Sequence, residues 1–417
     1  MSDYSQTFTV RRLWLILAAS MLLMFGTLLY FGGEIYHLAP PIPERVLTES
    51  GDTLFTRTDI ERGQNVWQSI GGMQQGSIWG HGSYLAPDWS ADWLHREATD
   101  LKERRNADVQ VEMRRNTYDS ERGTITVSAE RAQAIRTVGD HYRDMFEGRS
   151  EAGLKLREQY AFPVHTRLSD GDAAALNAFF FWTSWAATTN RPGDTITYTS
   201  NWPHEPLVGN VPTAPVFLWT FISILVLLAG IGAIVWYYAR MFDVWRRDLE
   251  PETGLAKVDF MESATITPSM RATAKLFWVV AALFLVQMLL GVVTAHYAVE
   301  GQGLYGLPMS DDLPYVITRT WHTQLAVLWI ATAWLATGLY VAPLLSGHEP
   351  KLQRFGVNFL FVSLLVIVVG AFAGQWLAVN GRIHDLVRNF WFGHQGYEYV
   401  DLGRFWQIYL FVGLILW

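Results

Sequence analysis

The sequence predicts a mainly α-helical membrane protein that crosses the bilayer several times and carries one soluble domain outside it. Half of the 417 residues are hydrophobic and only 17% are charged, which is below the roughly 25% usual in soluble domains. Long apolar segments recur along the chain, and one polar stretch, residues 35–215, separates the first from the second. The fold class follows: a polytopic helix bundle of about six spans, the last incomplete, with an outer domain.

The first five apolar segments are each long enough to cross a hydrocarbon core about 30 Å thick, which takes roughly 20 helical residues. In chain order they are Leu13–Phe31, Val216–Tyr238, Leu276–Ala298, Tyr315–Leu345 and Phe355–Ala378. A sixth begins at Phe405 and is too short to span when the sequence stops at Trp417. We therefore expect the N-terminal part of a longer polypeptide.

Basic residues predict the orientation. Arg11 and Arg12 precede the first span, and no small-residue cleavage site follows it, so residues 1–34 form an uncleaved anchor with its N-terminus inside. Residues 35–215 then lie outside. The basic loop within residues 216–275 falls inside, as do Lys351 and Arg354. The positive-inside rule is satisfied at each loop.

Composition excludes several kinds of function. The net charge of -7 is spread over the polar segments without a basic block, which argues against a nucleic-acid partner. The chain has no cysteine, so it has no CxxCH heme attachment, no thiolate metal site and no iron-sulfur cluster. The outer domain must hold together by its core alone.

The outer domain combines helical patterning at Ala129–Phe146 with a Gly- and Trp-rich segment, Gly63–Trp93. Five glycines in that segment allow close backbone approach to something, or a loop folded on its own tryptophans. Thr197–Pro212 is predicted to be an extended lead into the second span. Its His204 and Glu205 are neighbours and point opposite ways on an extended chain, which favours a structural loop over a metal site.

His322 opens the apolar run of the fourth span, where an ionisable group is costly. One interpretation is a metal ligand, most plausibly to heme iron. The other is an interfacial histidine that reaches headgroup water beside Trp321 as a belt aromatic. By the predicted topology His296 ends the third span on the same side, so we expect both histidines at one depth near the outer face.

Acidic residues accompany these positions. His296 and Glu300 are four apart and share a face if the third span continues through Glu300, unless headgroups simply solvate them. Glu398 and Asp401 are three apart just before the sixth segment and would also share a helical face. Helix N-terminal acids favoured by the macrodipole are the alternative.

Several segments together give a family resemblance over the length of the chain. The most specific are Gly63–Glu97, Tyr198–Thr213, His296–Gly303, Thr318–His322 and Gly396–Phe405. The chain resembles the N-terminal portion of the quinol-dependent nitric oxide reductases, single-chain members of the heme-copper oxidase superfamily. The resemblance implies a bacterial inner membrane, a periplasmic cytochrome c-like domain at residues 35–215 that has lost its heme, and the start of the catalytic helix bundle at residues 276–417.

The resemblance also assigns residues. His322 matches the axial ligand of a low-spin heme b. His296 and Glu300 match the lining of the quinol pocket, and Leu304 stands there where the family usually has an aromatic residue. Glu398 matches a residue that helps to bind calcium, and Asp401 matches an acid near the outer proton route. We add the hypothesis that Arg319, three residues before His322, pairs with a heme propionate.

The implied reaction joins two NO to N2O and water, in respiratory denitrification, with electrons from membrane quinol. The family's second, high-spin heme and its non-heme iron are held by later helices, so we expect no catalytic residue in this chain and no activity from it alone. An oxygen-reducing quinol oxidase is one rival; a non-catalytic receptor or transporter subunit with a solute-binding domain is another. The quinone used and a homodimeric state are left open.

Overall fold

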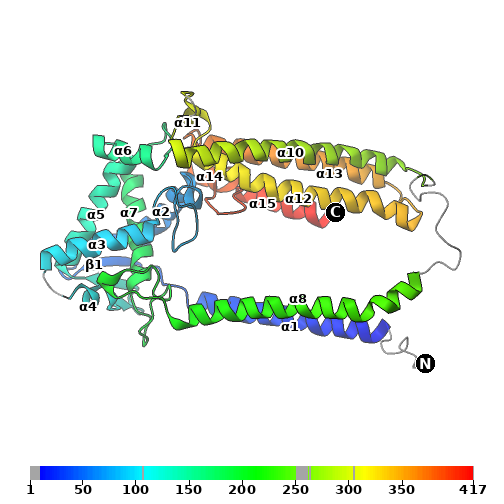
Figure 1. Ribbon diagram of the computed structural model, residues 1–417. Helices are drawn as coiled ribbons and strands as arrows, with labels where there is room; N and C mark the ends of the chain where they lie inside the picture. Colours follow the sequence, from blue (N-terminus) through cyan, green and yellow to red (C-terminus); the bar gives the residue numbers. More distant parts are fainter. Residues whose placement is uncertain (1–9, 106–107, 250–261, 263, 304–305, 417) are drawn as a thin grey trace.

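The computed structural model describes residues 10–105, 108–249, 262, 264–303 and 306–416. An outer domain stands at one end, and two sets of long helices leave it in the same direction (Figure 1). Within the described residues, five helices are long and apolar enough to cross a membrane. The predicted class, a mainly α-helical chain with several spans and an outer domain, is confirmed.

Each long helix contains one predicted apolar segment. The five are α1 (Val10–His37), α8 (Ala214–Leu249), α10 (Pro268–Glu300), α12 (Tyr315–Ser346) and α13 (Gln353–Val379). A shorter apolar helix, α15 (Arg404–Leu416), follows the short helix α14 (Leu386–Phe392). The helix α10 does continue through Glu300, as the spacing of His296 and Glu300 required.

The long helices differ in how they pack. Helices α10, α12 and α13 share buried apolar clusters, one of which brings together Leu276, Ala336 and Val357. Helices α1 and α8 lie apart from that group in Figure 1, and their spanning segments bury no residue. Their apolar faces are therefore those of helices surrounded by lipid or by further protein.

The outer domain is helical with a small sheet. Its helices are α2 (Arg57–Ser69), α3 (Trp89–Arg105), α4 (Val109–Arg114), α5 (Ala129–Glu147), α6 (Glu151–Gln159) and α7 (Asp170–Thr188). Four strands, β1 (Arg45–Thr48), β2 (Thr53–Thr56), β3 (Tyr118–Asp119) and β4 (Thr124–Val127), pair in the order β2-β1-β4-β3. Strand β1 runs parallel to β4, and the other two pairs are antiparallel. The sequence did not predict this sheet.

Local signals explain where these helices begin and end. Thr56 and Asp59 form a capping box at the start of α2, each side chain binding the other's backbone N–H. Ser128 caps α5, which ends at Gly148 in the left-handed conformation. The helix predicted at Ala129–Phe146 is thus confirmed.

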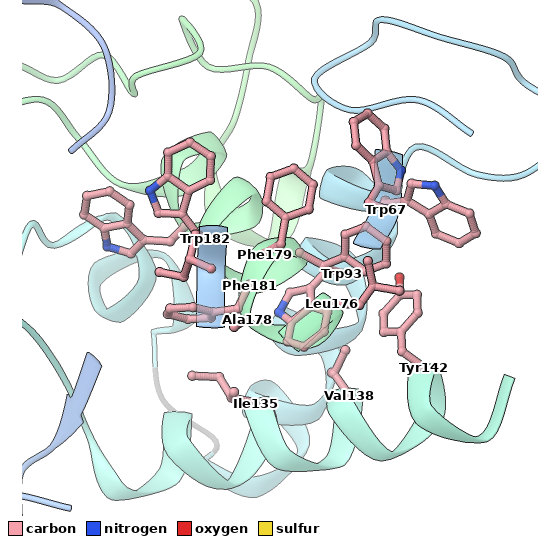
Figure 2. Close-up of a cluster of buried hydrophobic side chains, with 14 of the residues drawn as sticks. Trp67, Trp93, Ile135, Val138, Tyr142, Leu176, Ala178, Phe179, Phe181 and Trp182 are labelled. Carbon is pink, nitrogen blue, oxygen red and sulfur yellow. The ribbon is translucent and has the colours of Figure 1, made fainter. Parts of the chain in front are cut away.

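Aromatic side chains fill the centre of the outer domain (Figure 2). Trp93 stacks on Tyr142 with ring centroids 5.3 Å apart, and Trp89 stacks on Phe180 at 5.4 Å. Almost every residue of α7 is buried, so this helix is the axis of the domain. The core supplies the apolar burial that a domain without disulfides needs.

The outer domain touches the bundle at several points. The Ser83 and Tyr315 hydroxyls are 2.8 Å apart, and Thr166 donates to the Val379 oxygen at 2.6 Å. Two connecting turns lie nearby: a 3-10 turn, η2 (Gly72–Gln74), and the short helix α11 (Met309–Asp312). The segment Thr197–Pro212 is a loop with a second 3-10 turn, η3 (Pro206–Val208), and not the extended lead expected. The domain boundaries at residues 34, 215 and 275 stay predictions.

Candidate functional site

His322 lies on α12 and faces α10. Its Nδ1 is 2.9 Å from the backbone oxygen of Gln287, and because that oxygen can only accept, Nδ1 carries the proton. The side chain of Gln287 is held in turn, since its Oε1 accepts from Trp329 Nε1 at 2.7 Å. Among the described residues, Nε2 of His322 has no hydrogen bond. The ring is therefore held in the tautomer that keeps a lone pair on Nε2.

A glycine makes room for this ring. A Cβ atom on Gly291 would lie 2.8 Å from Cε1 of His322, closer than any ordinary contact. A larger residue there would push the imidazole away from the Gln287 oxygen. Helix α10 therefore sets both the position and the tautomer of His322.

The expectation that His296 and His322 lie at one depth is wrong. His322 is level with Gln287 and Gly291 on α10, which precede His296 along that helix. At 1.5 Å per residue, His322 is roughly 10 Å deeper in the bundle than His296. The reason is that α12 begins at Tyr315, almost two turns before His322.

Trp321 does not behave as a belt aromatic. Its ring stacks on Phe372 of α13 with centroids 5.1 Å apart, and its Nε1 donates to Gln375 Oε1 at 3.1 Å. It is packed between helices and hydrogen-bonded there. The interfacial interpretation of His322 beside a headgroup-facing tryptophan loses its support.

The donor set at His322 fits a heme iron. An axial imidazole binds iron through one ring nitrogen while the other donates to an acceptor that orients it. His322 has this arrangement, with Gln287 as the acceptor. The chain can therefore offer one axial nitrogen from a rigid helix.

Arg319 lies one turn outward from His322 and reaches the outer domain. Its Nη1 donates to Gln74 Oε1, and its Nη2 is 3.9 Å from Glu398 Oε1. The guanidinium is thus beside the predicted cofactor ligand and bridges α12 to the loop that precedes α15. Its pairing with a propionate stays a prediction.

The calcium expectation for Glu398 does not gain support from its neighbours. The nearest charged group to its carboxylate in the ion pairs of the described residues is the Arg319 cation. No cluster of three or more His, Asp or Glu side chains suited to a metal ion occurs in the described part of the chain. These side chains alone do not fit calcium, and we derive no step through that ion.

Glu398 and Asp401 do not share a helical face. Helix α15 begins only at Arg404, and the residues before it form a loop. The Asp401 side chain is fully buried, whereas that of Glu398 is 22% exposed. Backbone N–H groups of Gln395 and Gly396 donate to Asp401 Oδ1 at 2.7 and 2.9 Å, so the loop winds around this carboxylate.

His394 is a candidate that the sequence reasoning missed. Its Nε2 is 2.7 Å from Asp401 Oδ2, and both side chains are fully buried. Its Nδ1 lies 3.0 Å from the backbone oxygen of Gln68 in the outer domain. A histidine a few residues before two acids, in a polar loop between apolar segments, was the available signal.

Buried amides complete this junction. Gln324 donates to the backbone oxygen of Asp401 at 2.7 Å, and Gln375 donates to the same oxygen. Gln375 Nε2 also lies 3.1 Å from Gln324 Oε1. Polar side chains inside a membrane bundle need such partners.

The predicted quinol residues lie together at the outer end of α10. His296 Nε2 is 3.5 Å from Glu300 Oε2 and 2.9 Å from the backbone oxygen of Gly303. The side chain of His296 is 10% exposed and that of Glu300 is 50% exposed, so an acid-base pair connects the bundle surface to the outside. The third predicted residue, Leu304, lies outside the described residues.

The outer domain covers one side of this pair. Gln302 Nε2 lies 3.4 Å from the backbone oxygens of Arg157 and Phe162. The guanidinium of Arg157 donates to the Pro163 and Thr166 oxygens, and burial lowers the pKa of Arg157 to about 10. This arginine remains charged at neutral pH and holds the covering loop in shape.

His204 and Glu205 do not converge on a ligand. His204 Nδ1 lies 3.1 Å from the Asn210 oxygen, whereas Glu205 Oε2 is 2.8 Å from His95 Nδ1. Glu205 also accepts from the Leu207 N–H and so starts the turn η3. The prediction of a structural loop is confirmed.

Two family matches agree with this arrangement. Residues 43–108 and 101–204 match the family described as the cytochrome c-like domain of nitric oxide reductase. Residues 271–417 match the family described as cytochrome C and quinol oxidase polypeptide I. No curated protein matches the chain.

The two matches cover the two halves of the architecture. The first coincides with the aromatic-cored outer domain, and the second begins in α10 and includes His322, His394 and Asp401. Heme cofactors and oxidoreductase chemistry accompany the second family. The chain therefore belongs to the heme-copper oxidase superfamily, with an outer domain of the nitric oxide reductase type.

Proposed function

We propose that this protein is a quinol-dependent nitric oxide reductase of a bacterial inner membrane, and that this chain carries its site of electron entry. The observation that carries the proposal is an outer domain of the nitric oxide reductase type in a chain without cysteine. Without cysteine no c-type heme can be attached there. A membrane quinol, bound on the bundle side, is then the favoured electron donor.

The pair His296 and Glu300 suits quinol oxidation. Each quinol hydroxyl must give up a proton as its electron leaves, and an imidazole next to a carboxylate can accept it. The two groups are 3.5 Å apart, and the exposed carboxylate of Glu300 can pass the proton to outer water. We expect the periplasm on that side of the membrane.

His322 is proposed as an axial ligand of a low-spin heme b, which when bound supplies a one-electron couple. The chain's own residues do the rest: Gln287 orients the ring, Gly291 leaves it space, and Arg319 brings a positive charge one turn away. Two electrons and two protons then join two NO to N2O and water. We assign that reduction step to no residue of this chain.

The second candidate is an oxygen-reducing quinol oxidase. The family that matches residues 271–417 includes quinol oxidases, which supports it. Both candidates use the same electron entry. They differ in the acceptor, so only an assay with NO and O2 separates them.

The first experiment is a reduced-minus-oxidised optical spectrum of the protein in membranes. We expect a low-spin b-type band that is lost in His322→Ala and kept in His348→Ala, because His348 is exposed and its side chain makes no hydrogen bond to the described part of the chain. Absence of any heme band in the unmodified protein would overturn the proposal and favour the receptor or transporter alternative.

The same membranes are then given quinol with NO or with O2. The proposal predicts quinol-driven consumption of NO, and a loss of that rate in His296→Ala with the heme band unchanged. Consumption of O2 alone would replace the first candidate by the second. An unchanged quinol KM and kcat in His296→Ala would remove this residue from the quinol site.

A further inference from the structure

The Gly-rich segment of the outer domain has a target in the structure. Gly72 (φ +50) lies against Gly396, and a Cβ on Gly72 would be 2.4 Å from the Gly396 Cα. The neighbouring Met73 N–H donates to the Gly396 oxygen at 2.8 Å. The two backbones are therefore in direct contact, which only glycine permits at this conformation and distance. The segment is a docking element for the loop before α15.

Gln74 stands at the centre of this contact. It is fully buried, and its side-chain amide donates to the oxygens of Tyr397 at 2.5 Å and Glu398 at 3.1 Å. Its oxygen accepts from Arg319. One outer-domain side chain thus binds both α12 and the loop before α15, with both of its donors and its acceptor engaged.

Arg319 depends on this neutral partner. The only carboxylate that pairs with Arg319 among the described residues, that of Glu398, is 3.9 Å away, which is too long for a hydrogen bond. The short contact to Gln74 therefore directs the guanidinium, while Glu398 supplies charge at longer range. Because Arg319 is three residues from His322, the direction of this cation decides how much positive potential reaches the group that His322 binds.

We infer that Gln74 is a positioning residue through which the outer domain sets the redox potential of the heme held by His322. It acts through Arg319 and does not touch the heme. This inference rests on the proposed function, because it takes His322 as the ligand. It gives the heme-free outer domain a role: it buttresses the electron-entry site in place of carrying electrons.

The test is a spectroelectrochemical titration of the low-spin heme in the intact protein. Removing the Gln74 contact frees Arg319 to turn toward water, so Gln74→Ala lowers the midpoint potential, as does Gln74→Met, which keeps the side-chain volume. The matched control is Gln75→Ala. Gln75 is an adjacent buried glutamine that donates to the Tyr160 oxygen inside the outer domain and does not bind Arg319. It leaves the potential unchanged.

A double-mutant cycle distinguishes positioning from general loosening. If Gln74 acts through Arg319, Gln74→Ala gives no further shift in an Arg319→Gln background. A shift of equal size in both backgrounds overturns the inference, as does an unchanged potential in Gln74→Met beside a shifted one in Arg319→Gln. The absence of a low-spin heme in the unmodified protein is a different result, since it removes the proposed function itself.

Discussion

The outer domain and the membrane helices bury their large side chains to very different degrees. Trp89 and Trp93 at the centre of the outer domain are 1% and 0% exposed, whereas Trp278 on α10 is 77% exposed. The outer domain removes its apolar surface from water by its own packing. The long helices leave theirs for lipid or for further protein. The stability of the first region is therefore internal, and that of the second depends on its surroundings.

Both regions nevertheless contain a buried ion pair. In the outer domain Arg131 Nε is 2.7 Å from Glu97 Oε1, with 3% and 0% of the side chains exposed. At the junction His394 and Asp401 form the other. The first pair joins two helices of one core. The second joins residues of one loop, which also binds the outer domain through Gln68. The same chemistry thus supports folding in one region and docking in the other.

The largest expected effect is on the outer core. Trp89→Ala should lower the free energy of opening of α7 by about 3–5 kcal/mol, because the cavity cannot collapse among stacked rings. Trp278→Ala should change the stability of α10 by no more than about 0.5 kcal/mol. Hydrogen exchange of the backbone amides in each helix measures both. Equal effects at the two positions would contradict the contrast between an internal core and open helices.

The two ion pairs give the next effect. Glu97→Gln should cost about 3 kcal/mol, since it leaves the Arg131 charge buried without its counter-ion, and the loss should appear in α3 and α5. Asp401→Asn leaves the His394 imidazole without its carboxylate. Its loss should appear in the loop before α15 and in the contact to Gln68.

Hydrogen exchange again reports the location. The matched control is Asp385→Asn, since Asp385 caps α14 at the surface and its ion pair with Arg388 is exposed. Destabilisation of α5 by Asp401→Asn, as strong as that by Glu97→Gln, would show that the junction pair supports the outer fold and not docking alone.

The parts of the fold that follow from local pattern could be predicted. Apolar length gave all five spans, and the 3.6-residue period gave the helix that became α5. The sheet could not be found this way, because its strands are two to four residues long and show no clean alternation. Capping at Thr56 and Ser128 was readable in principle, since Asp59 and Glu130 follow in the first turns.

The site divides in the same manner. His296 and Glu300 could be paired from their spacing because both are on one helix. Glu398 and Asp401 could not, since their loop is shaped by His394, by backbone N–H groups and by distant amides such as Gln324. Gln287 carried an unused signal: a polar side chain within an apolar span needs a partner, and it binds Trp329 while its carbonyl holds His322.

The smallest effect concerns pH and separates the two regions once more. Burial lowers the pKa of His141 on α5 below its usual value near 6.5, and the Arg96 cation lowers it further, against the opposing charges of Asp92 and Asp144. The unfolded chain then binds more protons than the folded one between these two pKa values. The stability that His141 gives is present above about pH 6.5 and falls as the pH drops through its folded pKa.

His141→Gln should therefore reduce the loss of protection of α5 between pH 7 and pH 5, with little change at pH 7. The control His165→Gln alters an exposed histidine of the same domain and should leave the acid response as it is. Protection factors, which correct for the intrinsic exchange rate at each pH, are the measurement. An acid response of α5 that is the same with and without His141 would assign it to other groups, whereas a response in α10 that tracked His141 would mean that the outer core and the bundle open together and are not the independent regions that their packing indicates.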